Sequence, residues 1–254
     1  MKKATSPRIL TLLAPLWLAA CAGAPASPSG EQSLTSAVEP SLRAAAAHAE
    51  SANDWNGAAQ HWRTLLAHHP DDLPISLSLA RALRISGKPD MAAELIQSLV
   101  AKHGANAQVH AELGKDYLAA DRLGLALKSL QKAAELAPDD WEIVSAQGVA
   151  LDLLEHPLEA QAAYQKALAL SPDNPQVLNN LALSQALSGD LRGAVATLRL
   201  AGEQPSAGSQ IRQNLALLLA LQGDPAQAER VAAKDLPPDL LRTNSQIYRR
   251  LSGQ

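Results

Sequence analysis

The hydrophobic and polar positions of this chain follow a pattern with a period of 34 residues. The stretch NLALSQALSGD, at 180–190, returns as NLALLLALQGD at 214–224, with eight of the eleven residues identical. Extending this register in both directions gives six blocks with no insertion or deletion between them. The blocks are 39–72, 73–106, 107–140, 141–174, 175–208 and 209–242. Self-similarity at such a period is typical of solenoids, in which one supersecondary unit is stacked many times.

Two positions of each block carry only small residues. Position 8 is alanine or glycine in all six blocks, and position 20 is always alanine. Position 24 is larger in five blocks, where it is Trp, Ile, Leu, Tyr or Leu. Small residues let two helices approach closely while the larger ones fill the space around them, so we expect each block to form a helix–turn–helix unit. The position-20 residues predicted to pack in the interior are Ala58, Ala92, Ala126, Ala160, Ala194 and Ala228.

Turn signals complete the unit. Position 15 is glycine in three blocks, at Gly87, Gly189 and Gly223, and glycine permits the positive φ that a tight turn requires. Position 32 is proline in three blocks, where it ends the second helix. The pattern resembles the tetratricopeptide repeat, so we predict an all-α superhelical solenoid of about six repeats over 39–242, closed by a capping helix at 243–254.

The N-terminus carries an export signal. Residues 1–20 combine three basic residues with an apolar stretch that is too short to span a membrane. Leu18-Ala19-Ala20-Cys21 resembles a bacterial lipobox, so Cys21, the single cysteine of the chain, is predicted to be the lipid attachment site. In bacterial lipoproteins an aspartate after the lipidated cysteine commonly signals retention in the inner membrane. This chain has Ala22 there, so we expect the lipid anchor in the outer membrane and the rest of the protein in the periplasm. Residues 21–38 are rich in Ala, Pro, Ser and Gly and are interpreted as a disordered tether.

The remaining composition points away from catalysis and nucleic acid. Without the signal, about 19 basic residues face 25 acidic ones, and no basic patch is present. Asp71-Asp72, Asp139-Asp140 and Asp173-Asn174 follow the position-32 prolines, where they are expected to cap helices. His61, His68 and His69 have no acidic or cysteine cluster beside them, so we predict no metal. No catalytic motif occurs, and we expect no enzyme and no cofactor beyond the lipid on Cys21.

A protein or peptide partner is expected in the groove formed by the first helices. Positions 5 and 6 of the last two blocks are carboxamides, which both donate and accept hydrogen bonds, although they could equally serve only to solvate the helices. Positions 9 and 13 of the same blocks are leucines. The predicted groove residues are Asn179, Asn180, Leu183, Leu187, Gln213, Asn214, Leu217 and Leu221. A clamp for a C-terminal carboxylate is incomplete, because only Arg81 and Lys115 supply basic residues.

The C-terminal stretch IRQNLALLLALQGDPAQAERVAAKDLPPD, at 211–239, resembles the end of the TadD-type lipoproteins of the tight-adherence (Flp) pilus system. The resemblance implies an outer-membrane pilotin or scaffold that assists assembly of the pilus secretin. Two alternatives stay open on the sequence. One is an adaptor of another pilus or secretion machine, and the other is a regulator that docks cell-wall enzymes.

Overall fold

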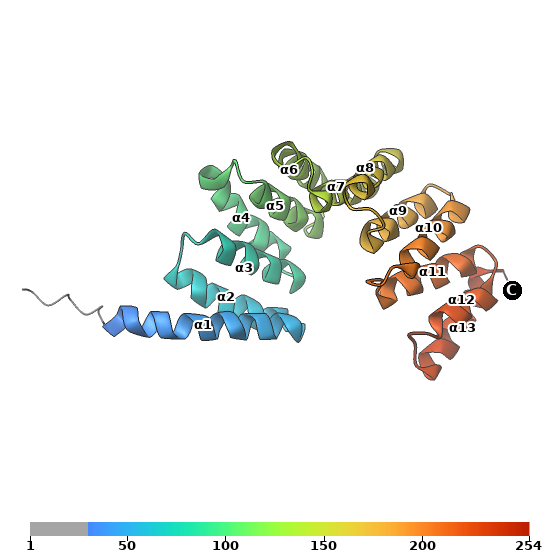
Figure 1. Cartoon of the computed structure of the whole chain (residues 1–254), viewed down its shortest axis with the longest axis horizontal. Coiled ribbons are helices and arrows are strands. Elements are labelled where there is room, and N and C mark those ends of the chain that lie inside the picture. Colours follow the sequence, from blue (N-terminus) through green and yellow to red (C-terminus); the bar gives the residue numbers. More distant parts are fainter. Residues whose placement is uncertain (1–29, 254) are drawn as a thin grey trace, which may run out of the picture.

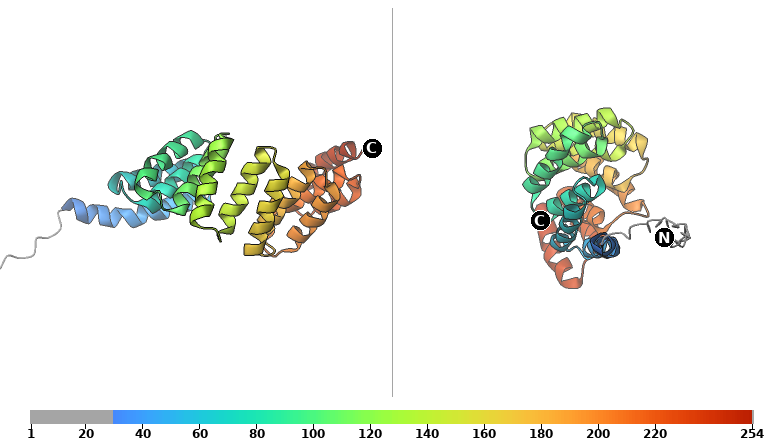
Figure 2. Two further views of the ribbon diagram at one scale, coloured as in Figure 1. Left: turned by 90° about the horizontal axis from the view of Figure 1, so that it is seen from above. Right: turned by 90° about the vertical axis from the view of Figure 1, so that its left-hand side faces the viewer.

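The computed structural model of the protein describes residues 30–253, which form thirteen α-helices arranged as an arch (Figure 1). The helices are α1 Gly30–Ser51, α2 Trp55–His68, α3 Leu73–Ile85, α4 Pro89–His103, α5 Ala107–Ala119, α6 Leu123–Leu136, α7 Trp141–Leu153, α8 Pro157–Leu170, α9 Pro175–Leu187, α10 Leu191–Glu203, α11 Ser209–Leu221, α12 Pro225–Ala232 and α13 Pro238–Leu251. The predicted signal peptide and Cys21 lie outside the described residues. Figure 2 shows the helices stacked in chain order, with α1 and α13 at opposite ends.

The helices repeat with the period read from the sequence. The first helices α3, α5, α7, α9 and α11 begin at residues 73, 107, 141, 175 and 209. The second helices α4, α6, α8, α10 and α12 begin at residues 89, 123, 157, 191 and 225. Every step in both series is 34 residues, so the same local structure forms at the same register each time. The predicted all-α solenoid is confirmed.

The turn between the two helices of a unit has the same backbone conformation in all six blocks. Position 15 has a positive φ each time, although three of the six residues are not glycine. The residues and their φ values are Asn53 59°, Gly87 81°, Asp121 57°, Glu155 62°, Gly189 90° and Gly223 92°. A residue in the left-handed conformation ends a helix, because the N–H groups near it can then bond to the last carbonyl groups of that helix. The turn therefore follows from its place in the repeat even where the sequence lacks the glycine.

The interior of each unit depends on small residues at the helix crossing. All six position-20 alanines have no exposed surface. At position 8, a Cβ added to Gly114 would lie 2.5 Å from Cγ of Leu130, and one added to Gly148 would lie 2.5 Å from Cε1 of Tyr164. The two helices therefore lie too close for any side chain at these two glycines, with a position-24 residue filling the space opposite.

The helix starts explain the acidic pairs of the sequence. Asp72 accepts a hydrogen bond from Ile75 N at 2.9 Å, and Asp140 accepts one from Glu142 N at the same distance. Asn174 likewise accepts from Gln176 N at 3.1 Å. These side chains satisfy N–H groups that have no partner within the helix, so the predicted capping role is confirmed for the second residue of each pair.

Two predicted boundaries are wrong at the ends of the chain. The residues from 30 to 38, assigned to the disordered tether, are the beginning of α1. Residues 31–38 contain no glycine or proline, and the averaged composition of the wider segment concealed this. The final helix begins at Pro238 instead of residue 243, because proline is favoured at the first position of a helix and the preceding helix α12 already ends at Ala232.

Candidate functional site

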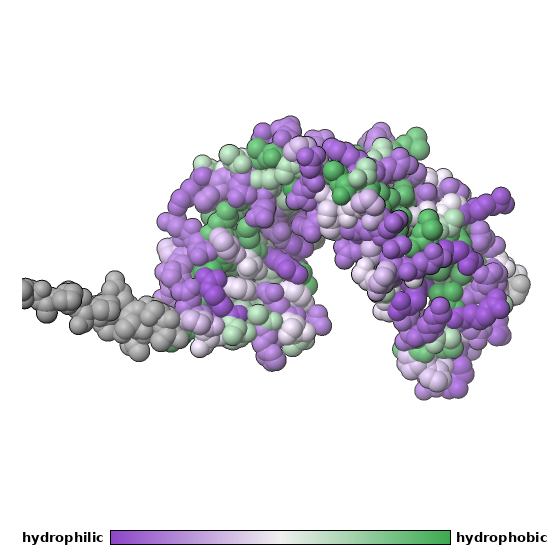
Figure 3. Space-filling view, viewed as in Figure 1, coloured by the Kyte–Doolittle hydropathy of each residue, from purple (hydrophilic) through white to green (hydrophobic). Residues whose placement is uncertain are grey.

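The inner side of the arch is the candidate functional surface. Figure 1 shows α7, α9 and α11 toward the hollow, with α6 and α8 on the outer side. The space-filling view shows that the hollow is open and that polar and apolar surfaces alternate around it (Figure 3). A solenoid exposes such a surface because each helix packs only against its neighbours in the stack.

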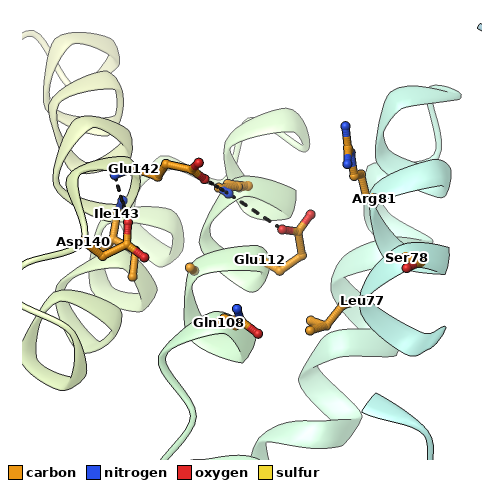
Figure 4. A pocket seen from close by; sticks show the side chains of 10 residues that line it. Leu77, Ser78, Arg81, Gln108, Glu112, Asp140, Glu142 and Ile143 are labelled. Atoms are coloured by element: carbon orange, nitrogen blue, oxygen red, sulfur yellow. Dashed lines mark hydrogen bonds and ion pairs between the residues drawn. The ribbon is translucent and has the colours of Figure 1, made fainter. Parts of the chain in front are cut away.

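A cavity of about 280 Å³ opens between the first helices of three successive repeats. Its wall is made by residues of α3, α5 and the beginning of α7, and the α5 residues repeat positions found on the other two helices. The charged residues among them are Arg81, Glu112, Lys115, Asp140 and Glu142. Figure 4 shows that Arg81 and Glu112 come from adjacent helices, while Glu142 extends from the next helix toward Glu112. Three repeats are thus needed to build this one site.

The two cations of the cavity, Arg81 and Lys115, are only loosely paired. The Lys115 Nζ atom lies 3.9 Å from a carboxylate oxygen of Glu112 and 3.9 Å from one of Glu142. The guanidinium of Arg81 lies 5.6 Å from the ring centroid of Trp55, within the range of a cation–π interaction. Contacts at these distances are too long for hydrogen bonds, so a ligand could replace them at little cost.

A buried charge cluster supports the wall of the cavity from behind. The Arg84 guanidinium donates to Oδ1 of Asp116 at 2.8 Å and also donates to Glu112. Asp116 is fully buried, and its Oδ2 atom has no hydrogen-bond partner among the described residues. Burial, together with the nearby Glu112 carboxylate, raises the pKa of Asp116 to about 7. One arginine therefore serves two carboxylates, one of which lines the cavity.

The predicted carboxamides in the last two repeats largely bind one another. The Asn214 side-chain amide donates to Oδ1 of Asn179 at 2.8 Å, and Asn179 makes a long 3.4 Å contact with Oδ1 of Asn180. This pairing joins α9 to α11 across 35 residues of sequence. Asn179 and Asn180 also line a second cavity of about 390 Å³ with Gln176 and Gln210. The described structure uses Asn179 and Asn214 as a link between repeats, and a role in reading a partner stays a prediction.

The four predicted leucines differ in their surroundings. Leu183 is half-buried, whereas Leu187, Leu217 and Leu221 are exposed. Gln213 is exposed as well, and none of these five residues lines either of the two cavities described above. Three of the four leucines are thus open surface that belongs to neither cavity.

An ion pair explains the irregular end of the last repeat. Arg212 donates to both carboxylate oxygens of Asp235, at 2.7 and 2.6 Å, and to the backbone oxygen of Ala207 at 3.1 Å. The hydrogen bonds to Arg212 lower the pKa of the Asp235 carboxyl. Asp235 breaks the small or apolar pattern of its repeat position because it holds the chain before α13 against α11.

The charged cavity of α3, α5 and α7 was missed as a binding site by sequence reasoning, although Arg81 and Lys115 were noticed. The signal was available, because eight of its ten lining residues occupy positions 2, 5, 6 and 9 of blocks two to four. These positions were used to choose groove residues in the last two blocks only.

Comparison with known proteins identifies the repeats. Tetratricopeptide-repeat profiles match residues 49–115, 163–196 and 211–234. The chain forms a tetratricopeptide-repeat solenoid. A comparison with curated proteins gives no match.

Solved tetratricopeptide structures share the fold. A thermophilic tetratricopeptide-repeat protein of Thermus thermophilus aligns with a TM-score of 0.66 and 24% identity, over 71% of this chain and 98% of that one. PilF of Pseudomonas aeruginosa aligns with a TM-score of 0.61 and 17% identity, over 84% of this chain and 99% of that one. MamA aligns with a TM-score of 0.51 and 22% identity, over 62% of this chain and 92% of that one. At these identities the likeness concerns the fold alone.

The tetratricopeptide fold defines the general class of activity. Such repeats are typically non-enzymatic scaffolds that mediate protein–protein interactions. Within residues 30–253, no group of three or more His, Cys, Asp or Glu side chains could hold a metal ion. The same part of the chain contains no helix with the length and apolarity needed to cross a bilayer.

Proposed function

We propose that this protein is a lipid-anchored outer-membrane scaffold, which binds an envelope protein through the inner face of its solenoid and assists assembly of the Flp pilus secretion apparatus. The observation that carries the binding role is the cavity of about 280 Å³ between α3, α5 and α7. Its lining comes from three repeats, so a partner lying across it would contact several repeats at once. Loosely paired charges at Arg81 and Lys115 give that partner polar groups to engage.

The assignment to the pilus rests on the sequence of the C-terminal stretch. Residues 211–239 resemble TadD-type lipoproteins, and the lipobox before Cys21 supplies the anchor expected of that family. In such an arrangement the anchor would hold the solenoid at the inner surface of the outer membrane. The pilus secretin, which assembles in that membrane, is the proposed partner.

Deletion and complementation test the role in the cell. Cells lacking the protein should lose secretin multimers and surface pili, and the wild-type chain should restore both. Normal multimers and pili in the deletion strain would overturn the assignment to the pilus.

A charge variant tests the site. Arg81→Ala with Lys115→Ala should reduce co-isolation of the secretin at least tenfold, because both cations of the cavity are lost. Lys128→Ala with Lys132→Ala is the matched control, since these lysines lie on the second helix α6 and are exposed. Equal secretin recovery with both double variants would mean that the cavity does not bind the partner, even if the deletion strain lacks pili.

A further inference from the structure

A buried carboxylate lies behind the wall of the cavity, at a repeat position that is uncharged in the repeats on either side. Position 10 is buried in blocks two to six, where it is Ala82, Asp116, Ala150, Ser184 and Leu218. The packing of the first helices therefore does not require a carboxylate there. Oδ2 of Asp116 has no hydrogen-bond partner among the described residues, and a buried carboxylate that lacks partners is stabilised when it binds a proton. These features point to a group that binds and releases a proton.

Arg84 connects Asp116 to the cavity. Its guanidinium donates to Oδ1 of Asp116 at 2.8 Å and also donates to Glu112, which lines the cavity. When Asp116 is ionised, Arg84 faces two carboxylates with a single positive charge. When Asp116 is protonated, the charge of Arg84 is left for Glu112 alone. The proton on Asp116 therefore sets how much negative charge Glu112 presents to the cavity.

The groups that act on this proton come from α3, α5 and α7. Burial raises the pKa of Asp116 and so does the Glu112 carboxylate, while Arg84 and Lys115 lower it, and the resulting pKa is about 7. Glu142 of α7 lies 3.9 Å from Lys115 and so joins the same cluster. An ordinary carboxyl group has a pKa near 4, so Asp116 changes its charge near neutral pH while the exposed carboxylates stay ionised.

The other titratable side chains around Asp116 are either exposed or engaged elsewhere. Helices α3, α4, α6 and α7 all pack against α5, and the acidic residues and lysines of α4 and α6 are exposed. His103 at the end of α4 acts on Asp71, and the His110 ring of α5 contacts the backbone oxygen of Gly104 at 2.9 Å. Asp152 of α7 accepts hydrogen bonds from side chains of α8 and α9. The cluster around Arg84 is therefore separate from these groups.

The same proton decides the net charge of the cavity. The lining carries two cations and three carboxylates, and Arg84 behind it adds a third cation. These charges cancel while Asp116 is protonated, and one net negative charge remains when Asp116 is ionised. Lys115 lies 3.9 Å from the carboxylate oxygens of Glu112 and Glu142, and Arg81 lies over the ring of Trp55. Both cations can therefore receive an anionic group of a ligand, and an added negative charge is opposed less when Asp116 holds its proton.

We propose that Asp116 is a proton switch for this cavity: its protonated form favours the binding of an anionic group by Arg81 and Lys115, and its ionisation weakens that binding. The inference rests on the proposed function in one respect, namely that the cavity is a binding site. Linkage makes the effect reciprocal, so a bound anion also favours the protonated form of Asp116. Binding at the cavity then depends on the pH around the protein.

A peptide titration at two pH values tests the switch in the full-length protein. The probe is a tetraglutamate peptide with blocked ends, whose side chains stay ionised at both pH 6 and pH 8. We expect the affinity of the wild type for this peptide to fall about fivefold or more from pH 6 to pH 8. Asp116→Asn is uncharged at both values, so its affinity at pH 8 should lie within about twofold of the wild type at pH 6. The histidines are the same in both proteins, so the difference reports Asp116. An unchanged wild-type affinity, or the same fall in Asp116→Asn, would overturn the proposal.

Two further variants locate the effect. Arg81→Ala with Lys115→Ala should weaken binding of the peptide about tenfold or more at pH 6, because both cations of the cavity are lost. Asp121→Asn is the matched control for Asp116→Asn, since it removes an exposed carboxylate just after α5, at a positive φ of 57° that asparagine tolerates. It should keep the pH dependence of the wild type. No binding by the wild type at pH 6, or equal binding by the double variant, would also overturn the proposal.

Carboxyl ¹³C NMR follows the switch without a ligand. In the wild type the Cγ signal of Asp116 should titrate near pH 7, and the Cδ signal of Glu112 should shift over the same range, because Arg84 contacts both groups. The shift of Glu112 over that range should be absent from Asp116→Asn. An Asp116 signal that titrates below about pH 5, or a Glu112 signal that does not follow it, would overturn the proposal even if a variant failed to fold.

The two proposals fail in distinguishable ways. If the deletion strain assembles pili normally, the assembly role is wrong, and the peptide titrations still decide whether Asp116 is a switch. If the deletion strain lacks pili but Asp116→Asn and the wild type bind the peptide with the same dependence on pH, the switch is wrong and the assembly role stands.

Discussion

Gly148 offers a sharp test of how the repeats pack, because two opposing effects act on its replacement by alanine. Alanine favours a helix over glycine by about 1 kcal/mol. An added Cβ would, however, lie 2.5, 2.7 and 2.9 Å from three ring atoms of Tyr164, where carbon atoms normally stay about 3.5–4.0 Å apart. The ring must therefore shift by about 1 Å.

Tyr164 has little freedom to make that shift. Its side chain is almost fully buried, and its hydroxyl donates to Oδ2 of Asp152 at 2.9 Å. The other oxygen of Asp152 accepts from Ser184 of the next repeat at 2.6 Å. Overpacking costs about 1–3 kcal/mol, and a weakened hydrogen bond adds about 0.5–1.5 kcal/mol. After the gain in helix propensity, we expect Gly148→Ala to lose about 1–3 kcal/mol of unfolding free energy.

Thermal unfolding followed by circular dichroism checks this value. A loss of this size lowers the Tm by about 2–4 °C per kcal/mol in a domain of this length. Gly202→Ala on α10 is the control, because its Cβ would meet no atom within 4 Å and the change should be neutral or stabilising. The double variant Gly148→Ala, Tyr164→Leu should lose less than the sum of its parts, since the two sites touch. A Gly148→Ala protein as stable as Gly202→Ala would refute the packing argument.

Four further predictions follow from the same contacts. Burial raises the pKa of Asp116 to about 7, above its value in the unfolded chain, so ionisation of Asp116 destabilises the fold increasingly from about pH 4 to 7. Asp116→Asn, with Arg84, Glu112 and Lys115 unchanged, should remove a pH-dependent loss on the order of 2–4 kcal/mol of unfolding free energy, measured by denaturant titration. The same dependence of stability on pH in the variant and the wild type would contradict this. Ala126→Leu and Ala160→Leu should each cost about 1–3 kcal/mol or more, whereas Lys128→Ala should stay within about 0.5 kcal/mol of wild type, and equal melting temperatures would exclude the register. Asn214→Ala should lower the free energy of unfolding by about 0.5–1.5 kcal/mol, because it removes the hydrogen bond to Asn179. An unchanged free energy of unfolding would contradict this prediction. Labelled fatty acid should enter the wild-type chain and be absent from Cys21→Ser, and label in that variant would rule out Cys21 as the attachment site.

The sequence alone determined the architecture of the solenoid. The position-20 alanines, the position-8 small residues and the turn glycines recur at 34 residues, and each acts on neighbours within its own repeat. Contacts between residues so close in the sequence form in the same way in every repeat, so the helix boundaries of one block predict those of the next. Helix caps such as Asp72 and Asp140 were predictable for the same reason, because a cap bonds to an N–H only two or three residues away.

Only the tertiary structure decided which side chains meet when they are far apart in the sequence. Arg84 meets Asp116 across 32 residues, Arg212 meets Asp235 across 23, and Asn214 meets Asn179 across 35. Each of these bonds depends on the geometry with which one helix packs on the next, which the pattern of small and large residues does not specify. For this reason Asn179 and Asn214, which the sequence predicted to bind a partner, are hydrogen-bonded to each other. The exposure of Leu153, Leu187 and Leu221 was decided in the same way, since a leucine at the end of a first helix is buried or open according to where the next helix lies.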